Sequence, residues 1–316
     1  MSESRRVLVT GGAGFIGSHV CEAYRDAGWN VTALDDLSSG SRENVPDGVE
    51  LIIEDIRSDG AGDLVRKGRF DLVNHHAAQI DVRVSVAQPR HDASINVDGL
   101  LNLLEACRDA DVGRFLFVSS GGVVYGEPED LPVGETAPKA PVSGYGVSKL
   151  TGEYYLFAFR KLFGIEAASL RYSNVYGPRQ DPFGEACVVA VFCSRILAGE
   201  PLTVFGDGLQ TRDYVYAGDV ARANMTLTEA VLTDPESIDD VAFNVATEQE
   251  TTVVDLGRTL GSAAGIEIEM QHAPARAGEV LRSCLRTEKL RGLGWAPATP
   301  LEQGLHFTYE HIARES

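Results

Sequence analysis

The stretch VLVTGGAGFIGSHV, Val7–Val20, decides how the rest of the chain is interpreted. Apolar residues typical of a buried strand lead into a run with four glycines, and a helical pattern follows. Glycines at 11, 14 and 17 let the backbone turn tightly and let the helix pack close to the sheet. The first amide groups of that helix would then face a phosphate group. The stretch therefore predicts a strand, a Gly-rich turn and a helix that together bind a dinucleotide.

An acidic residue stands at the end of the next predicted strand, about twenty residues after the glycines. A carboxylate at that position, Asp35, can bind both hydroxyls of a ribose and repels a 2′-phosphate. Asp36 follows it, and no basic residue comes before Arg42. The sequence therefore predicts NAD rather than NADP. A third predicted strand ends at Asp55 and Ile56. Two interpretations of this position stay open: a contact with adenine, and an acidic residue that simply ends a strand.

Strands and helices alternate up to about residue 175, and the strands are apolar on both faces. This pattern predicts an α/β fold with a Rossmann-type doubly wound parallel sheet, covered by helices on both sides. We expect residues 1–174 to form an NAD-binding domain. Residues 175–316 are expected to form mainly a smaller α/β substrate-binding lobe, with part of 206–250 returning to the first domain.

The overall composition excludes several classes of function. The chain has 316 residues and a formal net charge of −18, which argues against nucleic acid because phosphate backbones need a basic face. No apolar run approaches the roughly eighteen residues of a transmembrane helix, and the N-terminus shows no signal-peptide pattern. Five cysteines without a CxxC pair predict free thiols, and hence a cytoplasmic protein. The adjacent His75 and His76 predict no metal site, because neighbouring side chains point to different sides.

A second motif stands in the segment GYGVSKLTGEYYLFAFRKLFG, residues 144–164, which is predicted to be a helix ended by its last glycine. Tyr145 and Lys149 are spaced i, i+4 and point from one face of that helix. A tyrosine has an ordinary pKa of about 10, and a neighbouring ammonium favours its phenolate. Such a pair can take a hydroxyl proton while NAD accepts a hydride. The two motifs together predict oxidation and reduction of a substrate alcohol.

Motifs spread over nearly the whole chain carry a resemblance to a known family. They are VTGGAGFIGSHV, HHAAQ, INVDGLLNLLEA, SSGGVVYGE, YGVSK, RYSNVYGPRQDPFGE, FGDGLQTRDYVY, FNVAT and ARAGEV. The chain resembles the extended short-chain dehydrogenases/reductases, in the NAD-dependent epimerase/dehydratase branch, and within it the UDP-glucose 4-epimerases most. The resemblance implies reversible 4-epimerisation of a UDP-hexose by transient oxidation at C4, with NAD bound tightly and recycled.

The resemblance also implies which residues contact the two ligands. Cofactor contacts would come from Gly11, Gly14, Phe15, Ile16, Gly17, Asp35, Asp55, Ile56, Ala77, Ala78, Asn96, Tyr145, Lys149 and Tyr172. Arg212 and Arg276 would bind the UDP phosphates, whose oxygens suit the planar guanidinium. Asn174 would contact the phosphates of the nucleotide sugar, and Glu279 the uridine ribose. The pocket wall would include Tyr172, Val188 and Val204.

One loop departs from the family pattern, because the usual Ser or Thr for the sugar 4-hydroxyl is replaced by Gly121. Three groups are candidates to replace the missing hydroxyl: Ser119, Ser120 and a water molecule. Ser120 is favoured, since adjacent strand residues point to opposite faces and Ser120 is nearer the loop. The predicted catalytic residues are therefore Tyr145, Lys149 and Ser120. Gly121 and Gly122 also replace the Asp-Glu pair of the resembling 4,6-dehydratases and the Glu of UDP-glucuronate decarboxylases, which favours epimerisation.

Sugar choice depends on Ser283, seven residues after Arg276. This position matches one where a bulky tyrosine blocks N-acetyl groups in the family, so the pocket is expected to admit UDP-N-acetylglucosamine as well as UDP-glucose. A UDP-glucuronate 4-epimerase, another nucleotide-sugar oxidoreductase or dehydratase, and a non-catalytic NAD-binding sensor are the alternatives.

The helix predicted at the second motif carries apolar residues on more than one face, among them Leu150, Tyr154, Tyr155, Leu156, Phe157 and Phe159. A wide apolar surface suggests a partner beyond the chain's own sheet. Members of the family pair this helix and the LLNLLEAC helix between two subunits, so we predict a homodimer.

Overall fold

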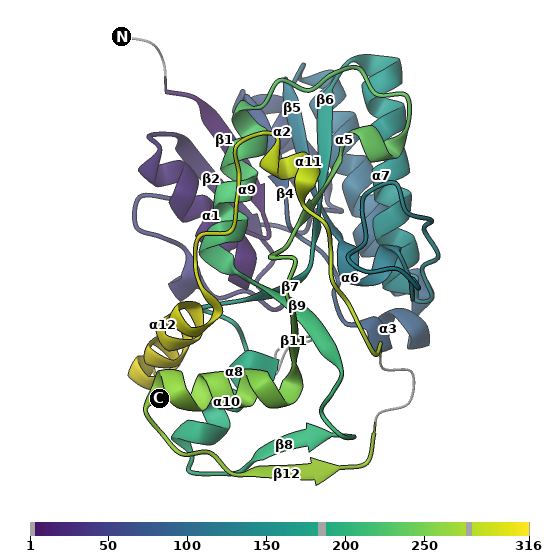
Figure 1. The fold of residues 1–316 in the computed structure, drawn as a ribbon. Coiled ribbons are helices and arrows are strands. Elements are labelled where there is room, and N and C mark those ends of the chain that lie inside the picture. The colour runs from purple at the N-terminus through teal and green to yellow at the C-terminus, as the bar shows by residue number, and fades with distance from the viewer. Residues whose placement is uncertain (1–3, 183–187, 276–279, 316) are drawn as a thin grey trace.

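A seven-stranded parallel sheet lies at the centre of the larger part of the molecule (Figure 1). The computed structural model describes residues 4–182, 188–275 and 280–315. The strands follow the order β10-β6-β5-β4-β1-β2-β3, and each neighbouring pair is parallel. They are β1 (Arg6–Thr10), β2 (Asn30–Asp35), β3 (Glu50–Ile53), β4 (Leu72–His75), β5 (Arg114–Ser120), β6 (Glu166–Tyr172) and β10 (Ala242–Val245). The predicted Rossmann-type fold is confirmed.

The strand order reverses its direction between β1 and β4. From β1 the chain first builds β2 and β3 on one side, and then returns to place β4, β5 and β6 on the other. In sheets of this kind the loops after the two central strands diverge and leave a crevice at the carboxyl edge. The Gly-rich turn follows β1 directly, so it lies at this switch point.

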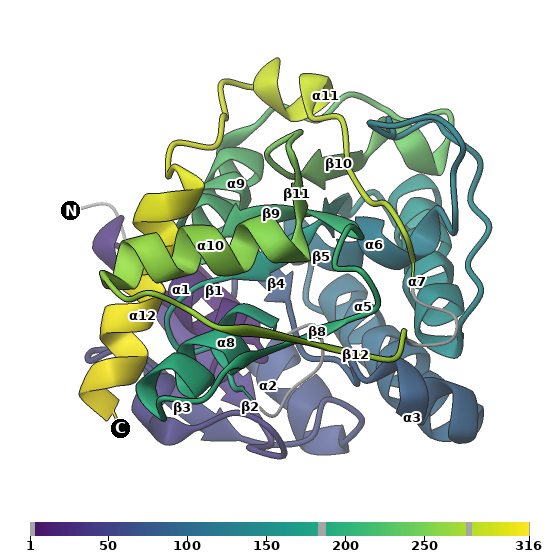
Figure 2. The ribbon, with the colours of Figure 1, turned by 60° about the horizontal axis from the view of Figure 1, so that its bottom comes forward.

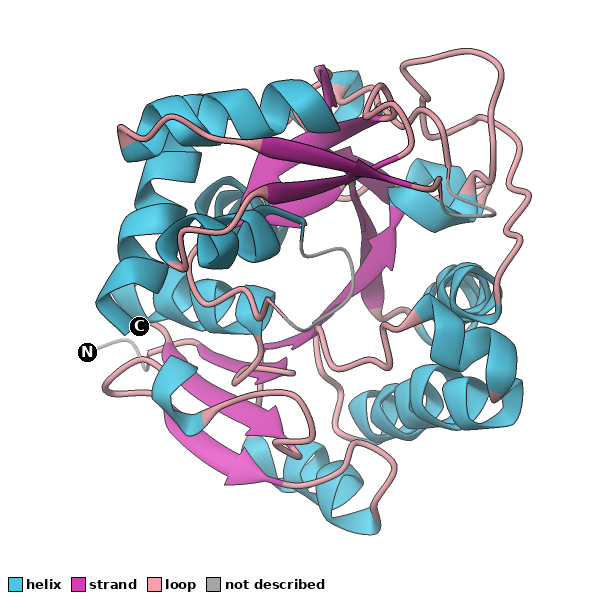
Figure 3. Ribbon diagram, turned by 90° about the horizontal axis from the view of Figure 1, so that it is seen from below, coloured by secondary structure: helices cyan, strands magenta, loops and turns pink. Residues whose placement is uncertain are grey.

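Helices cover both faces of the sheet (Figure 3). α1 (Phe15–Asp26) and α9 (Ala217–Glu229) pack together on one face, and α2 (Asp59–Gly68), α5 (Gly99–Asp109) and α7 (Gly144–Phe163) cover the other. Each face of the sheet has its own hydrophobic core, because side chains alternate along a strand. In β1, Val7 and Val9 pack into the core beside α1 and α9, whereas Leu8 packs into the core beside α2 and α5. Short helical segments are η1 (Arg42–Asn44), α3 (Val82–Ala87), α4 (Pro89–Ala93), η2 (Ser94–Asp98), α6 (Gly121–Val124), η3 (Ile238–Asp240) and α11 (Glu288–Arg291).

A smaller lobe is attached at the carboxyl edge, because β6 passes almost directly into β7. Its strands form one three-stranded and one two-stranded sheet, and Figure 2 brings the β8–β12 pair, α8 and α10 forward. The elements are β7 (Asn174–Tyr176), α8 (Val188–Leu197), β8 (Leu202–Phe205), β9 (Thr211–Tyr216), β11 (Glu250–Thr252), α10 (Val253–Ala264), β12 (Met270–Ala273) and α12 (Leu301–Glu315). The expected domain boundary after residue 174 falls inside β7 and stays a prediction.

Within the described ranges, no helix has both the length and the apolar character needed to cross a membrane.

Candidate active site

The Gly-rich turn packs tightly against the loop that follows β4. Gly11 has a φ of +68°, and a Cβ there would lie 2.7 Å from the backbone nitrogen of Ala77. A Cβ on Gly17 would overlap the carbonyl oxygen of Gly11. Both positions therefore require glycine because backbone segments approach each other closely. The turn and the loop that begins at Ala77 and Ala78 lie side by side as a result.

The N-terminus of α1 offers donors suited to an anion. Gly14 is its N-cap residue, and the helix has neither a side-chain cap nor an acidic residue in its first turn. The leading N–H groups, on Phe15, Ile16 and Gly17, have no partner within the helix. Together with the helix dipole they favour a bound phosphate. This arrangement fits the pyrophosphate of a dinucleotide.

Asp35 lies at the end of β2, beside the same turn. Its carboxylate accepts hydrogen bonds from the backbone N–H groups of Ala13 (3.0 Å) and Leu37 (2.9 Å). Burial raises the pKa of this carboxyl, and the two amide hydrogen bonds counteract the shift. A Cβ on Gly40 would lie 2.9 Å from Asp35 Oδ1, so that glycine leaves room for the carboxylate. The acidic group is thus fixed where the cofactor ribose is predicted to bind.

Asp55 and Ile56 follow the end of β3. The side-chain hydrogen bond from Arg57 lowers the pKa of Asp55, and the ion pair measures 2.5 Å from Nη2 to Oδ2. Ile56 is buried, and its carbonyl oxygen accepts a hydrogen bond from Asn102 Nδ2 at 2.7 Å. The structure thus gives both residues protein partners, and their contact with adenine stays a prediction.

Three predicted catalytic side chains meet beyond the carboxyl end of β5. Ser143 caps α7 and thereby places Tyr145 in the first turn of that helix. The hydroxyl of Ser120 lies close enough to the Tyr145 phenol to lower its pKa. Lys149 Nζ lies 5.7 Å from the centre of the Tyr145 ring. The same ammonium donates to the carbonyl oxygen of Val118 at 2.9 Å, which fixes it on the strand.

Burial controls the protonation of this group. It raises the pKa of the Tyr145 phenol, and the charge of Asp92 raises it further, whereas the Ser120 hydrogen bond lowers it. Burial lowers the pKa of Lys149 to about 8, and Asp92 opposes that shift. Tyr145 therefore holds its proton at neutral pH in the ligand-free protein. A cationic ring bound beside the pair would favour the phenolate.

The neighbours of Ser120 face other partners. Ser119 Oγ donates a hydrogen bond to Glu153 Oε1 at 2.5 Å. A Cβ on Gly121 would overlap Cδ1 of Leu285, a buried side chain. Leu285 therefore fills the space that a Ser or Thr side chain at position 121 would need. Of the two serines proposed to replace that hydroxyl, Ser120 is the one that lies against Tyr145.

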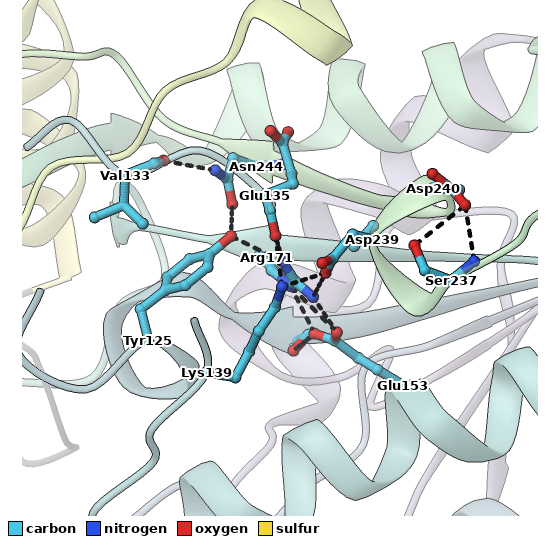
Figure 4. Close-up of polar contacts among 12 residues, drawn as sticks. Tyr125, Val133, Glu135, Lys139, Glu153, Arg171, Ser237, Asp239, Asp240 and Asn244 are labelled. Atoms are coloured by element: carbon cyan, nitrogen blue, oxygen red, sulfur yellow. Dashed lines mark hydrogen bonds and ion pairs between the residues drawn. The ribbon is translucent and has the colours of Figure 1, made fainter. Parts of the chain in front are cut away.

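A buried polar network anchors the other side of β5 (Figure 4). Arg171 in β6 is fully buried, and its guanidinium donates to Glu153 Oε2 (2.6 Å), the Tyr125 phenol oxygen (2.9 Å) and the carbonyl oxygen of Glu135 (2.8 Å). Glu153 also accepts the hydrogen bond from Ser119. The network therefore fixes the end of β5, and with it the direction of the next residue, Ser120.

Asn96, a predicted cofactor contact, lies in the π-helical turn η2, a kind of irregularity that is frequent at functional sites. Its side chain accepts from the backbone N–H of Gln79 and donates to the carbonyl oxygen of Gln79, each at 2.9 Å. It also donates to Asp92 at 3.1 Å. Asp92 is not among the site residues predicted from the sequence, although its i, i+4 spacing from Asn96 was an available signal.

The predicted contacts to the nucleotide sugar lie in the smaller lobe and its connections. Asn174 begins β7, and Arg212 in β9 is half-buried with its guanidinium donating to the Thr211 carbonyl oxygen at 2.8 Å. Ser283 is half-buried. Two further predicted contacts, Arg276 and Glu279, lie outside the described residues.

The three predicted wall residues differ in their surroundings. Tyr172 is buried, and its phenol oxygen accepts a hydrogen bond from Asn224 at 2.7 Å. Val188 is half-buried at the beginning of α8. Val204 is fully buried in the small-lobe core, where a Cβ on Gly208 would contact it. Because its side of β8 faces that core, Val204 has no exposed surface for the predicted pocket wall.

Comparison with known proteins places this site among enzymes. Residues 7–246 match the NAD dependent epimerase/dehydratase family. A protein of Methanocaldococcus jannaschii named putative UDP-glucose 4-epimerase is 43% identical over 299 residues, which cover 95% of each chain. The crystal structure of UDP-glucose 4-epimerase with UDP-glucose from Thermotoga maritima is similar with a TM-score of 0.92 and 41% identity, over 98% of this chain and 99% of that one. The Thermus thermophilus UDP-glucose 4-epimerase in complex with NAD gives a TM-score of 0.90 and 43% identity over the same shares.

Proposed function

Since this chain belongs to the NAD dependent epimerase/dehydratase family, we propose that it is an NAD-dependent epimerase that interconverts UDP-glucose and UDP-galactose at C4. The family resemblance expected from the motifs is confirmed by that match. The observation that carries the proposal is the meeting of Ser120, Tyr145 and Lys149 beside a Gly-rich turn suited to a dinucleotide. NAD, when bound, would supply the acceptor and donor of the hydride at C4 of the sugar.

The residues of the chain handle the proton. Tyr145 takes the proton of the 4-hydroxyl during oxidation and gives it back during reduction. The Lys149 ammonium stabilises the phenolate by charge, and its bond to the Val118 carbonyl oxygen keeps it in place. Ser120 donates to the oxygen of Tyr145 or of the substrate and orients the alcohol. Ser120 and Tyr145 lie together at the end of β5, so one sugar oxygen would reach both hydroxyls while the Lys149 charge lies beside them.

The loop after β5 favours epimerisation over elimination. Loss of water across C5 and C6 needs an additional acid and base near the sugar. Gly121 and Gly122 occupy the corresponding positions and carry no functional group. A Cβ at position 121 would overlap Leu285 Cδ1, so a side chain there would require Leu285 to move.

The substrate contacts are proposals that depend on the family. Arg212 and Arg276 would bind the two phosphates, Asn174 would donate to the phosphates, and Glu279 would accept from the uridine ribose. Ser283 would leave space near C2, so UDP-N-acetylglucosamine would also be a substrate. Turnover of UDP-galactose without turnover of UDP-N-acetylgalactosamine would contradict the assignment of Ser283.

We also propose that two copies pair through α7 and α5. Several apolar side chains of α7 are exposed, among them Val147, Tyr154, Leu162 and Phe163, and Leu162 is 73% exposed. A surface of this kind is typical of an interface. Light scattering at micromolar concentration is expected to give twice the mass of the 316-residue chain, and a clean monomer would reject the proposal.

A reducing compartment, the cytoplasm, is the proposed location. Cys21, Cys107, Cys193 and Cys284 are free thiols, and each is buried. Buried unpaired thiols are typical of proteins that work in reducing surroundings. Fractionation of cells that produce the protein would test this assignment.

The proposed activity is tested with purified protein and no added cofactor. UDP-galactose is incubated with the protein, and the sugar signals are followed by proton NMR. We expect conversion to UDP-glucose without accumulation of reduced cofactor. Absence of conversion even with added NAD would contradict the proposed function.

A further inference from the structure

Asp92 is a buried acidic residue close to the catalytic pair. It lies in α4, with 1% of its surface exposed. Its Oδ1 accepts hydrogen bonds from Gln79 Nε2 at 2.9 Å and Asn96 Nδ2 at 3.1 Å. Its Oδ2 accepts a hydrogen bond from the Ser148 hydroxyl at 2.6 Å. Burying a carboxylate is costly unless such partners compensate it.

The set of partners fits a charged carboxylate. An ionised carboxylate accepts hydrogen bonds only, whereas a protonated one also carries a donor. Gln79 and Asn96 present amide N–H groups to Asp92, and Ser148 presents its hydroxyl. Each of these described contacts brings a donor to a carboxylate oxygen. The geometry therefore favours a negative charge inside the protein at this position.

The carboxylate joins two parts of the active site. Gln79 and Asn96 belong to the loop after β4 and to η2, the segments that flank the predicted cofactor crevice. Ser148 lies in α7 directly before Lys149 and three residues after Tyr145. Asp92 thus connects the cofactor side of the site to the helix that carries the proton-transfer pair.

We propose that Asp92 is a positioning residue of the 4-epimerase reaction. Through its hydrogen bonds to Gln79, Asn96 and Ser148 it fixes α7 against the loop after β4 and holds a negative charge beside the segment that carries Tyr145 and Lys149. The inference rests on the proposed function. The inference goes beyond the proposed function because Asp92 touches neither the sugar nor the reacting atoms and acts through Lys149 and Tyr145.

The electrostatics agree with this role. The charge of Asp92 raises the pKa of Lys149, which burial lowers to about 8, and it adds to the burial that raises the pKa of Tyr145. Burial holds the pKa of the neighbouring His75 and His76 low, so neither is charged near neutral pH. The other charged groups on the elements around Asp92 are exposed or paired with other residues. They include Asp81, Arg83, Arg90, His91, Asp98, Glu105, Arg114, Glu153, Glu166, Arg171 and Asp239.

The substitution Asp92→Asn isolates the charge. The remaining oxygen can accept from both Gln79 and Asn96, and the new amide can donate to Ser148, whose hydroxyl also accepts. All three hydrogen bonds can therefore persist while the charge is removed. Without the charge, Lys149 loses its proton at lower pH and Tyr145 also loses its proton at lower pH.

The test is the pH profile of kcat/KM for UDP-galactose, together with the NAD content of the purified enzyme. In D92N both limbs of the profile are expected to move to lower pH, each by about one pH unit, with NAD retained. Unmoved limbs, whatever the height of the profile, would overturn the proposal. Inactivity of the unmodified enzyme would instead overturn the proposed function, so the two failures are distinguishable.

Two control variants and a second neutral variant complete the design. Ser148→Ala keeps the charge and removes one hydrogen bond, so its limbs are expected to stay in place. Asp98→Asn removes an exposed charge from the adjacent turn and is expected to leave profile and activity unchanged. Asp92→Ser, also neutral, should shift the limbs as D92N does if D92N folds poorly. Failure of both neutral variants to fold or to hold NAD would overturn the proposal, since Asp92 would then serve stability alone.

Discussion

Ser119 and Ser120 end β5 with their hydroxyls directed to opposite sides of the strand. Ser119 donates to the buried Glu153, whereas the Ser120 hydroxyl lies against the Tyr145 phenol. Alternation along a strand requires this, since successive side chains point to opposite faces. One serine therefore belongs to the Arg171 network and the other to the catalytic group.

This difference predicts opposite effects for two alanine variants. Ser120→Ala should lower kcat by about 10- to 100-fold, because one donor to the reacting oxygens is lost, and leave the melting temperature nearly unchanged. Ser119→Ala should retain activity and lower the free energy of unfolding by about 1–3 kcal/mol, because Glu153 loses a buried donor. Steady-state kinetics and thermal unfolding on both variants check this. The reverse pattern would assign the catalytic hydroxyl to Ser119.

Removal of the phenol is expected to have the largest effect on turnover. In Tyr145→Phe the proton acceptor is missing while the ring still fills its place, so kcat should fall by about 10²- to 10⁴-fold. NAD content, measured after release by denaturation, should equal that of the unmodified enzyme. Substantial activity in this variant would show that another group carries the proton.

In a variant that lacks the Ser120 hydroxyl, a serine introduced at position 121 should not restore activity. Its Cβ would overlap Leu285, so Gly121→Ser should be destabilised by about 1–3 kcal/mol. The double variant S120A/G121S should be no more active than S120A alone. Gly122→Ala is the matched control, because the nearest atom to a Cβ there is Ser120 Oγ at 3.7 Å, an ordinary contact. Recovery of activity in the double variant would contradict the geometry of this loop.

Cofactor retention should depend on close backbone approach at the Gly-rich turn. In Gly17→Ala the new methyl group would overlap the Gly11 carbonyl oxygen, so the purified variant should contain little NAD. Gly134→Ala is a suitable control, since no atom of the described residues lies within 4 Å of a Cβ there. Absorbance of the cofactor released from equal amounts of both variants provides the comparison. Full NAD content in the Gly17 variant would contradict the role given to the turn.

The half-buried His76 predicts loss of stability in acid. Burial, with a smaller contribution from Lys149, lowers its pKa from 6.5 to about 3. Between these values the unfolded chain binds a proton that the folded chain does not, so the free energy of unfolding falls as the pH falls. His76→Phe, which keeps a ring against Tyr172, should lose less stability on acidification. Urea unfolding at neutral and mildly acidic pH measures the difference, and equal losses in both proteins would exclude His76 as a cause.

Local patterns in the sequence led to the predicted cofactor site and the predicted catalytic helix. The glycines of Val7–Val20 and the i, i+4 spacing of Tyr145 and Lys149 are each contained in a short stretch of sequence. Their chemistry is therefore visible without knowing the fold. The alternation of strands and helices likewise led to the parallel sheet, because each strand must be covered on both faces.

Contacts between distant segments could not be predicted in this way. Leu285 fills the space beside Gly121 only after the chain returns from the smaller lobe. Asp92 meets Ser148 because α4 packs against α7, which no spacing reveals. The alternating pattern around Val204 fits a strand, but it does not tell whether the Val204 side chain faces the core or the substrate pocket. That depends on how β8 packs against α8 and α10.

The measurement that tests the central claim most directly uses UDP-galactose deuterated at C4 of the sugar. The purified enzyme is incubated with it in ordinary water, and the product is examined by NMR. Transient oxidation at C4 with return of the same hydride predicts UDP-glucose that keeps the deuterium at C4. Loss of the deuterium to solvent, or its appearance at another carbon, would contradict the account of the site.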